Sequence, residues 1–256
     1  MSDRSPLAAR PASTVVLARA CHGDSGYEVY FTRRPDHFTF VGGIHVFPGG
    51  AMDDADQRPP ILARVRGLTA AQAQAELAGS PDGTVALAHW VTAVREVFEE
   101  AGVLLAVTPG GADADGSAAR RALAAVPRTH EDGAAAVFLD HLEREDLLVA
   151  ADRIRYFSHW ITPPGPPRRF DTRFFVARLP PGQDPVPHPT EVAEARWLSP
   201  TAAIATWEAG ELLLLPPAVF TLQQLSSLGS LDQVFARTDL AAESETRGNA
   251  RLAESW

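Results

Sequence analysis

The sequence predicts an α/β fold in which a mixed β-sheet lies between layers of helices. Three observations lead to this prediction. Segments typical of strands recur along the chain, a glycine-rich turn follows the first pair of them, and a helix with a cluster of acidic residues comes next. The chain of 256 residues is long enough for one full hydrophobic core, and its apolar content of 45% is that of a globular protein.

The first half of the chain is expected to contain two strands, a glycine loop and two helices. Residues 14–20 are apolar and partly β-branched and residues 27–33 alternate, so we expect an antiparallel pair of strands. Residues 42–50 predict a short strand that enters a tight loop, where glycines let the backbone approach a ligand closely. Helices are predicted over residues 69–78 and 84–101.

The second half of the chain is expected to alternate between helices and strands again. Proline is favourable in the first helical turn, which predicts helix starts at Ser199-Pro200 and Pro216-Pro217 and makes the second of these the last helix. The other helices are predicted over residues 117–125 and 131–145, and the strands over residues 154–161, 169–179 and 191–198.

The most informative stretch is the acidic end of the helix predicted over residues 84–101. Glu96, Glu99 and Glu100 lie three and four positions apart, so a helix places all three on one face. Like charges repel there unless a cation lies between them, and hard carboxylate oxygens suit Mg²⁺ or Mn²⁺. A solvated acidic face is the plainer interpretation of such a run. Gly102 is expected to end the helix.

A glycine turn with further acids precedes this helix. Together with residues 95–103, Gly50 and Asp56 resemble the signature of the Nudix hydrolases, G-x5-E-x7-R-E-U-x-E-E-x-G-U, in which U is a bulky apolar residue. Residues 95–103 match the second half of the signature at every specified position, and Asp56 stands where the family has Glu. Asp53 occupies another position at which relatives often carry Glu.

The chain departs from the family signature in length. Between Asp56 and Arg95 lie 38 residues, where the signature has seven. This interruption, together with residues 160–163 (Trp-Ile-Thr-Pro) and 169–175 (Arg-Phe-Asp-Thr-Arg-Phe-Phe), resembles the Nudix branch of the peroxisomal coenzyme A diphosphatases. The additional residues could be a surface excursion, which loops tolerate, or one wall of the substrate pocket. We expect residues 57–83 to contribute to specificity.

The resemblance implies a Nudix-type α/β/α sandwich with helical insertions and a reaction that depends on Mg²⁺ or Mn²⁺. We expect one domain over residues 13–240, with insertions at about 57–83 and 108–150, between a flexible segment 1–12 and a disordered tail 241–256. The site residues that the resemblance implies are the metal ligands Glu96, Glu99, Glu100 and the backbone of Gly49, the catalytic residues Glu99, Glu100 and Arg95, and the supporting acids Asp53 and Asp56.

The identity of the substrate depends on the branch resemblance, which implies hydrolysis of coenzyme A or acyl-coenzyme A to a phosphopantetheine product and 3′,5′-ADP. Thr39 stands where many coenzyme A-cleaving relatives have Arg, so an ADP-ribose, NADH or dinucleotide pyrophosphatase stays open. A non-catalytic ligand-binding regulator is a further alternative, although a binder has no need of three repelling acids. Candidate substrate contacts are Arg33, Arg34, His89, Arg168, Arg169 and Arg173.

The composition narrows the possible partners. The formal net charge of −9 argues against a broad nucleic-acid surface, but it is compatible with a phosphate substrate because bound metal ions reverse the local charge. The sequence lacks the run of about 18 apolar residues that a membrane span needs. A single cysteine, Cys21, excludes an intramolecular disulfide. We therefore expect a cytoplasmic protein that acts on a small nucleoside-diphosphate compound, as a monomer or a homodimer.

Overall fold

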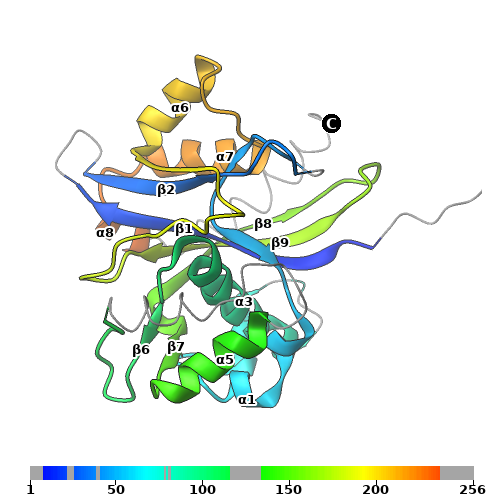
Figure 1. The fold of residues 1–256 in the computed structure, drawn as a ribbon, viewed down its shortest axis with the longest axis vertical. Coiled ribbons are helices and arrows are strands. Elements are labelled where there is room, and N and C mark those ends of the chain that lie inside the picture. Colours follow the sequence, from blue (N-terminus) through cyan, green and yellow to red (C-terminus); the bar gives the residue numbers. More distant parts are fainter. Residues whose placement is uncertain are drawn as a thin grey trace, which may run out of the picture.

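The fold is organised around one mixed β-sheet (Figure 1). The structure is a computed structural model, and it describes residues 8–21, 26–38, 41–77, 79, 82–115 and 134–236. In these ranges the sheet has seven strands, which are β1 (Arg10–Ala20), β2 (Tyr27–Arg33), β3 (His45–Val46), β4 (Gly49–Ala51), β8 (Ile154–Ile161), β9 (Phe170–Arg178) and β10 (Glu194–Leu198). Their order is β10-β2-β1-β9-β8, with β3 paired to β2 and β4 paired to β1.

Helices cover both faces of this sheet (Figure 1). The long helix α3 (Gly83–Ala101) lies on one face. The other face carries α6 (Pro200–Glu208), α7 (Pro216–Ser226) and α8 (Leu231–Ala236). The predicted α/β/α sandwich is therefore confirmed.

Strand β1 is buried on both sides, and its alternating residues supply two separate cores. Val15 and Leu17 belong to the core that contains Trp90 of α3, whereas Val16 and Ala18 belong to the core under α6, α7 and α8. Successive side chains of a strand point to opposite faces, so one continuous apolar run can serve both layers. The parallel pairing of β1 with β9 fixes this central position in the sheet.

The sheet splits between β1 and β2, and the glycine loop occupies the split. The two strands pair antiparallel, as predicted, through residues 18–20 of β1. Further along, β3 pairs with the end of β2, and β4 pairs with the start of β1 so that Thr14 lies opposite Gly49. The carbonyl of Pro48, between β3 and β4, accepts a hydrogen bond of 2.8 Å from the N–H of Val15. The loop is thus held at the centre of the sheet.

The insertion in the signature packs behind α3, on the side of the helix away from the sheet. It follows a short 3₁₀ turn η1 (Asp54–Gln57), which contains Asp56 of the signature, and consists of helices α1 (Pro59–Leu62) and α2 (Ala70–Glu76) and strand β5 (Val65–Arg66). Strand β5 joins β7 (Leu148–Ala150) and β6 (Ala106–Val107) in a second sheet, and α5 (Ala134–Arg144) lies in the same layer (Figure 1). The two insertions therefore meet each other.

Apolar side chains of the first insertion are part of the core around α3. Ile61, Ala73 and Leu77 are fully buried there. This insertion is consequently neither a surface excursion nor a wall of the apolar pocket described below, whose lining contains no residue from 57–83. Its buried contacts are those of a structural element, and its contribution to specificity stays a prediction.

Several predicted boundaries are also corrected. Residues 10–12, expected to be flexible, belong to β1 because they pair with β4 and β9. Helix α8 follows α7, so the helix at Pro216 is not the last one. The helix predicted over residues 117–125 and the tail 241–256 lie outside the described residues. Among the helices that the structure describes, none has the length and apolar character required to cross a lipid bilayer.

Candidate active site

Helix α3 carries the acidic cluster, and local contacts fix both of its ends. Asp82 accepts a hydrogen bond of 2.9 Å from the backbone N–H of Val85, which satisfies one of the free donors of the first turn. At the other end Gly102 adopts a left-handed conformation with φ of 64°, which glycine allows at little steric cost. The helix therefore ends directly after the three glutamates, as predicted.

Arg95 lies at the centre of the cluster. Its Nε and Nη2 donate to the two carboxylate oxygens of Asp56 at 2.9 and 2.8 Å. Its Nη1 donates to Glu96 and Glu99 at 2.8 and 3.0 Å, and Nη2 also bonds the carbonyl of Ala51 at 3.1 Å. The side chains of Arg95 and Asp56 are 4% and 0% exposed. Arg95 therefore positions the acids, and its expected part in catalysis stays a prediction.

Burial raises the pKa values of all three glutamates. The pKa of Glu99 is raised to about 8 mainly by burial, although the charge of Arg95 opposes this shift. Burial also raises the pKa of Glu96, again against Arg95, and the pKa of Glu100, to which the charge of Glu96 adds. One guanidinium does not compensate so many buried acids. Burial therefore disfavours the charged forms of these acids, and a bound cation would favour them.

The residues of the cluster fit a divalent cation. Their donors are hard carboxylate oxygens with excess negative charge, and Glu99 Oε1 is buried without a hydrogen-bond partner among the described residues. In the described ranges no group of three acidic, His or Cys side chains is already arranged to bind one metal ion. Arg95 Nη1 instead donates to both Glu96 and Glu99. Glu96, Glu99 and Glu100 are the residues that would hold the cation.

The two glycines of β4 let the glycine loop lie against these acids. A Cβ atom on Gly50 would lie 2.5 Å from a carboxylate oxygen of Glu96, so a larger residue would displace that side chain. The N–H of Gly49 donates to Glu100 at 3.2 Å. A Cβ atom on Gly49 would instead lie 2.5 Å from Thr14 Oγ1. Both glycines of β4 thus contact the acids, and Gly49 also lies against β1.

The loop before β10 supplies a further acid that the sequence analysis did not assign. The N–H groups of Val186 and His188 donate to the carbonyls of Ala101 and Glu100 at 2.7 and 3.0 Å, and so satisfy free carbonyls at the end of α3. This attachment brings Glu191 near the cluster, where its charge adds to burial in raising the pKa of each of the three glutamates. In the sequence, the only sign that Glu191 belongs to the acid cluster is the acidic character of residues 191–194.

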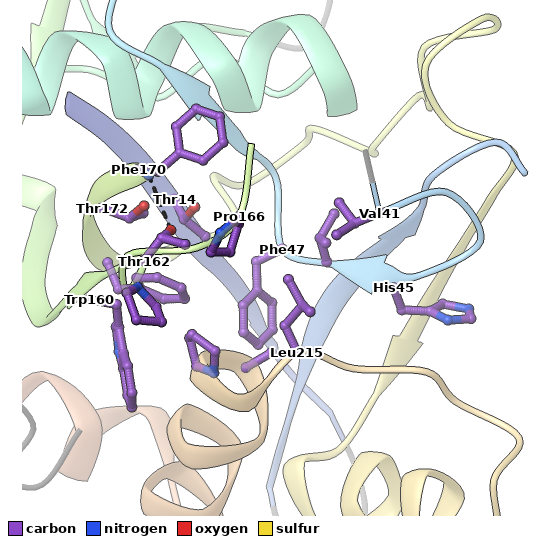
Figure 2. Close-up of a pocket in the computed structure, with 15 residues that line it drawn as sticks. Thr14, Val41, His45, Phe47, Trp160, Thr162, Pro166, Phe170, Thr172 and Leu215 are labelled. Atoms are coloured by element: carbon purple, nitrogen blue, oxygen red, sulfur yellow. Dashed lines mark hydrogen bonds between the residues drawn. The ribbon is translucent and has the colours of Figure 1, made fainter. Parts of the chain in front are cut away.

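An apolar pocket of about 290 Å³ lies on the other face of the sheet, between β1, the β8–β9 connection and the start of α7 (Figure 2). The rings of Phe47 and Trp160 flank it, whereas the ring of His45 points away (Figure 2). The described residues that line it are Thr14, Val41, His45, Val46, Phe47, Trp160, Thr162, Pro163, Pro166, Phe170, Thr172, Phe174, Leu215, Pro217 and Ala218.

Comparison with known proteins decides the family. A family model described as the NUDT19 Nudix domain matches residues 9–225. The chain belongs to the Nudix hydrolase family. This confirms the resemblance to the branch of the coenzyme A diphosphatases, which rested on the interrupted signature and on residues 160–163 and 169–175.

Individual relatives agree with the family model. This Nudix hydrolase is 30% identical to the acyl-coenzyme A diphosphatase NUDT19 of Gallus gallus, over 88% of this chain and 70% of that protein. It is 29% identical to the Homo sapiens protein of the same name and spans 63% of that protein's length. Its fold matches the crystal structure of a NUDIX hydrolase from Alicyclobacillus acidocaldarius with a TM-score of 0.72 and 26% identity, over 90% of this chain and 96% of the other.

The supporting acids have structural roles in this Nudix hydrolase. Asp53 caps η1 by accepting from the N–H of Ala55 at 2.7 Å, and its own N–H donates to Asp56 at 3.0 Å. Asp56 also accepts from the hydroxyl of Thr92 at 2.8 Å, so its oxygens are fully used within the protein. Both acids hold the loop and Arg95 in place, and Asp56 has no exposed oxygen for a metal.

Two of the candidate substrate contacts are interior residues. The side chain of Arg173 is 3% exposed and donates to Asp171 at 3.1 Å, and Asp171 also bonds His159. His89 is buried, and its Nδ1 lies 3.0 Å from Ser13 Oγ. Burial lowers the pKa of His89 to about 4, so it is neutral. These positions correct the predicted substrate contacts at Arg173 and His89.

The other candidate arginines remain near the surface. Arg34 is half-buried beside Glu100, and its Nε has no hydrogen-bond partner in the described part of the chain. Arg33 pairs with Asp36. Arg169 donates from Nε to the carbonyl of Thr162 at 2.9 Å, at the rim of the apolar pocket, and Arg168 beside it is exposed. Arg34 is thus the candidate nearest to the acids.

Proposed function

We propose that this Nudix hydrolase cleaves the diphosphate of coenzyme A or acyl-coenzyme A with Mg²⁺ or Mn²⁺, giving a phosphopantetheine product and 3′,5′-ADP. The observation that carries the proposal is a buried acid cluster on one side of strand β4 and an apolar pocket, built from both parts of the branch motif, on its other side. The names of the Gallus gallus and Homo sapiens relatives support the same substrate class.

The acid cluster has the properties that diphosphate hydrolysis requires. A bound divalent cation would neutralise phosphate charge and acidify the attacking water. Glu96, Glu99 and Glu100 would hold that cation, and Arg95 orients two of them through its Nη1. Water attacks one phosphorus, the bridging P–O bond breaks, and the proton of the water passes to a carboxylate of the cluster or to Glu191.

The test is a substrate panel with products identified by mass spectrometry. Purified protein is incubated with coenzyme A, an acyl-coenzyme A, ADP-ribose and NADH, each with Mg²⁺, with Mn²⁺ and with EDTA. We expect 3′,5′-ADP from the first two substrates and no turnover in EDTA. Faster cleavage of ADP-ribose or NADH would replace the proposed substrate class, and binding without turnover of any compound would support a ligand-binding regulator instead.

A further inference from the structure

We infer that the apolar pocket binds the acyl-pantetheine arm of the substrate and so determines specificity; this inference rests on the proposed function. The pocket is separated from the acid cluster by one strand. Thr14 in its wall lies opposite Gly49, whose N–H donates to Glu100, and Phe47 is two residues before that glycine. Since β4 lies between the two, a substrate whose diphosphate is at the acids would reach the pocket with a substituent that extends past the glycine loop.

The charge of the lining selects between these two substituents. Among the described residues, the pocket wall contains no Lys, Arg, Asp or Glu, and His45 turns its ring away (Figure 2). The adenosine end of coenzyme A carries a 3′-phosphate, whose burial without a cationic partner would be costly. The acyl-pantetheine arm is uncharged, and its acyl chain is a hydrocarbon, so the acyl end of this arm matches the lining.

The hydrogen-bonding groups of the pocket also disfavour the adenine base. The indole N–H of Trp160 donates to Ser158 at 3.1 Å, and the hydroxyl of Thr162 accepts from the N–H of Phe170 at 3.1 Å (Figure 2). The indole donor and one acceptor site of the Thr162 hydroxyl are thus already used within the protein. An adenine edge needs several donors and acceptors when it is buried, whereas a hydrocarbon chain needs none.

The alternation of side chains along β9 explains why residues 169–175 contact both the layer of α3 and the apolar pocket. Asp171 and Arg173 face α3 and bond each other, and the residues between and beside them point into the pocket. The pocket-facing members of the whole motif are Trp160, Thr162, Pro163, Phe170, Thr172 and Phe174. About 290 Å³ is at the low end for ligand sites, so the pocket accommodates one segment of the substrate rather than all of it.

Filling the pocket from α7 tests the inference. Ala218 lines the pocket, so Ala218→Phe would occupy its space. The matched control is Ala205→Phe, the same change at an exposed position of α6. We expect the wild-type protein to prefer octanoyl-coenzyme A over coenzyme A by about tenfold or more in kcat/KM. Ala218→Phe should reduce this preference to about unity, and the control should retain it.

A binding experiment separates this inference from the proposed function. Calorimetry without metal measures the affinity for S-octanoyl-4′-phosphopantetheine and for 3′,5′-ADP. Ala218→Phe should weaken the first at least about tenfold and leave the second unchanged. If the wild-type protein hydrolysed no coenzyme A compound, the proposed function would fail, but the effect of the variant on octanoyl-phosphopantetheine binding would still decide the role of the pocket.

Two results would overturn the inference. One is an unchanged octanoyl preference in a folded Ala218→Phe protein. The other is a selective loss of 3′,5′-ADP binding, which would assign the pocket to the adenosine end. If circular dichroism shows that Ala218→Phe does not fold, Ala218→Val decides instead, because this smaller change must lower the octanoyl preference by about threefold or more.

Discussion

Arg95 donates two parallel hydrogen bonds to the carboxylate of Asp56, although 38 residues lie between them in the chain. The two ends of the inserted segment therefore lie close together, because Asp56 in the first half of the signature is bonded to Arg95 in the second half. Both partners are buried, and Thr92 and the N–H of Asp53 complete the bonding of Asp56. The interruption alters the length of the signature but preserves its internal contacts.

Asp56→Asn should destabilise the protein strongly. The change removes the charge that compensates a buried guanidinium, which costs about 3–5 kcal/mol when one partner of a buried pair is lost. Chemical denaturation of the metal-free protein measures the free energy of unfolding. Asp54→Asn, the same change at an exposed acid two residues earlier, is the control and should cost less than about 0.5 kcal/mol. Equal effects of the two variants would contradict the structural role of the Asp56–Arg95 pair.

Glu99→Gln and Glu100→Gln should each lower turnover by at least about a hundredfold, because each removes a charged ligand or a proton acceptor while preserving shape. Electron paramagnetic resonance of Mn²⁺ should show weaker binding in both variants. Glu143→Gln, an exposed position on α5, is the control for the loss of one negative charge. Unchanged activity and unchanged Mn²⁺ affinity in both site variants would exclude the metal assignment.

Ile61→Ala should cost about 2–5 kcal/mol of stability, because it removes a fully buried side chain from the core around α3. Replacement of residues 57–83 by a Gly/Ser connection should prevent cooperative unfolding, since it also removes Ala73, Leu77 and the Asp82 cap of α3. Urea denaturation measures both effects, with Gln74→Ala on the exposed side of α2 as the control. A shortened protein of wild-type stability would show that the insertion is dispensable.

The sequence was sufficient for the features that depend on local spacing. The positions of Glu96, Glu99 and Glu100 on one helical face, the end of that helix at Gly102 and the strand over residues 154–161 all follow from periodicity and glycine conformation. The structure confirms each of them. The recognised signature supplied the fold, because the order of strands, glycine loop and acidic helix is that of one family.

The sequence alone could not predict which side chains of a buried strand face the pocket and which face α3. Strand β9 is covered on both sides, so alternation alone does not say whether Arg173 or Phe174 faces the pocket. The sequence analysis assigned Arg173 to the substrate, whereas it is Phe174 that lines the pocket. Glu191 reaches the acids only because its loop is bonded to the end of α3, which is a tertiary contact without a local signal.

His89 should make the stability of the protein depend on pH. Its pKa is about 4 in the folded state and about 6.5 when unfolded, so only the unfolded state binds this proton between those values. The contribution is therefore present above pH 6.5 and is lost as the pH falls towards 4, by roughly 3 kcal/mol. Unfolding free energies of wild type and His89→Gln at pH 7 and pH 4.5 measure it. The variant should lose less stability on acidification, and the exposed His37→Gln control should behave like wild type.

Arg34 should contact the phosphates of the substrate. It is the candidate arginine beside Glu100, its Cζ lies 5.0 Å from the centre of the Phe38 ring, and its Nε lacks a hydrogen-bond partner among the described residues. A charge-assisted contact of this kind contributes about 1.5–3 kcal/mol, which is a factor of about ten or more. Arg34→Ala should therefore lower kcat/KM at least about tenfold for both coenzyme A and dephospho-coenzyme A, with Arg178→Ala on the exposed end of β9 as the control.

The ratio of the two rates separates Arg34 from Arg169. Dephospho-coenzyme A lacks only the 3′-phosphate, so a residue that binds this group changes the ratio, whereas a residue that binds the diphosphate lowers both rates equally. Arg169 is bonded to Thr162 at the rim of the pocket that we assign to the acyl-pantetheine arm. We therefore expect Arg169→Ala to retain the wild-type ratio. A ratio that falls towards unity in Arg169→Ala would place the 3′-phosphate at this rim and would also count against the assignment of the pocket.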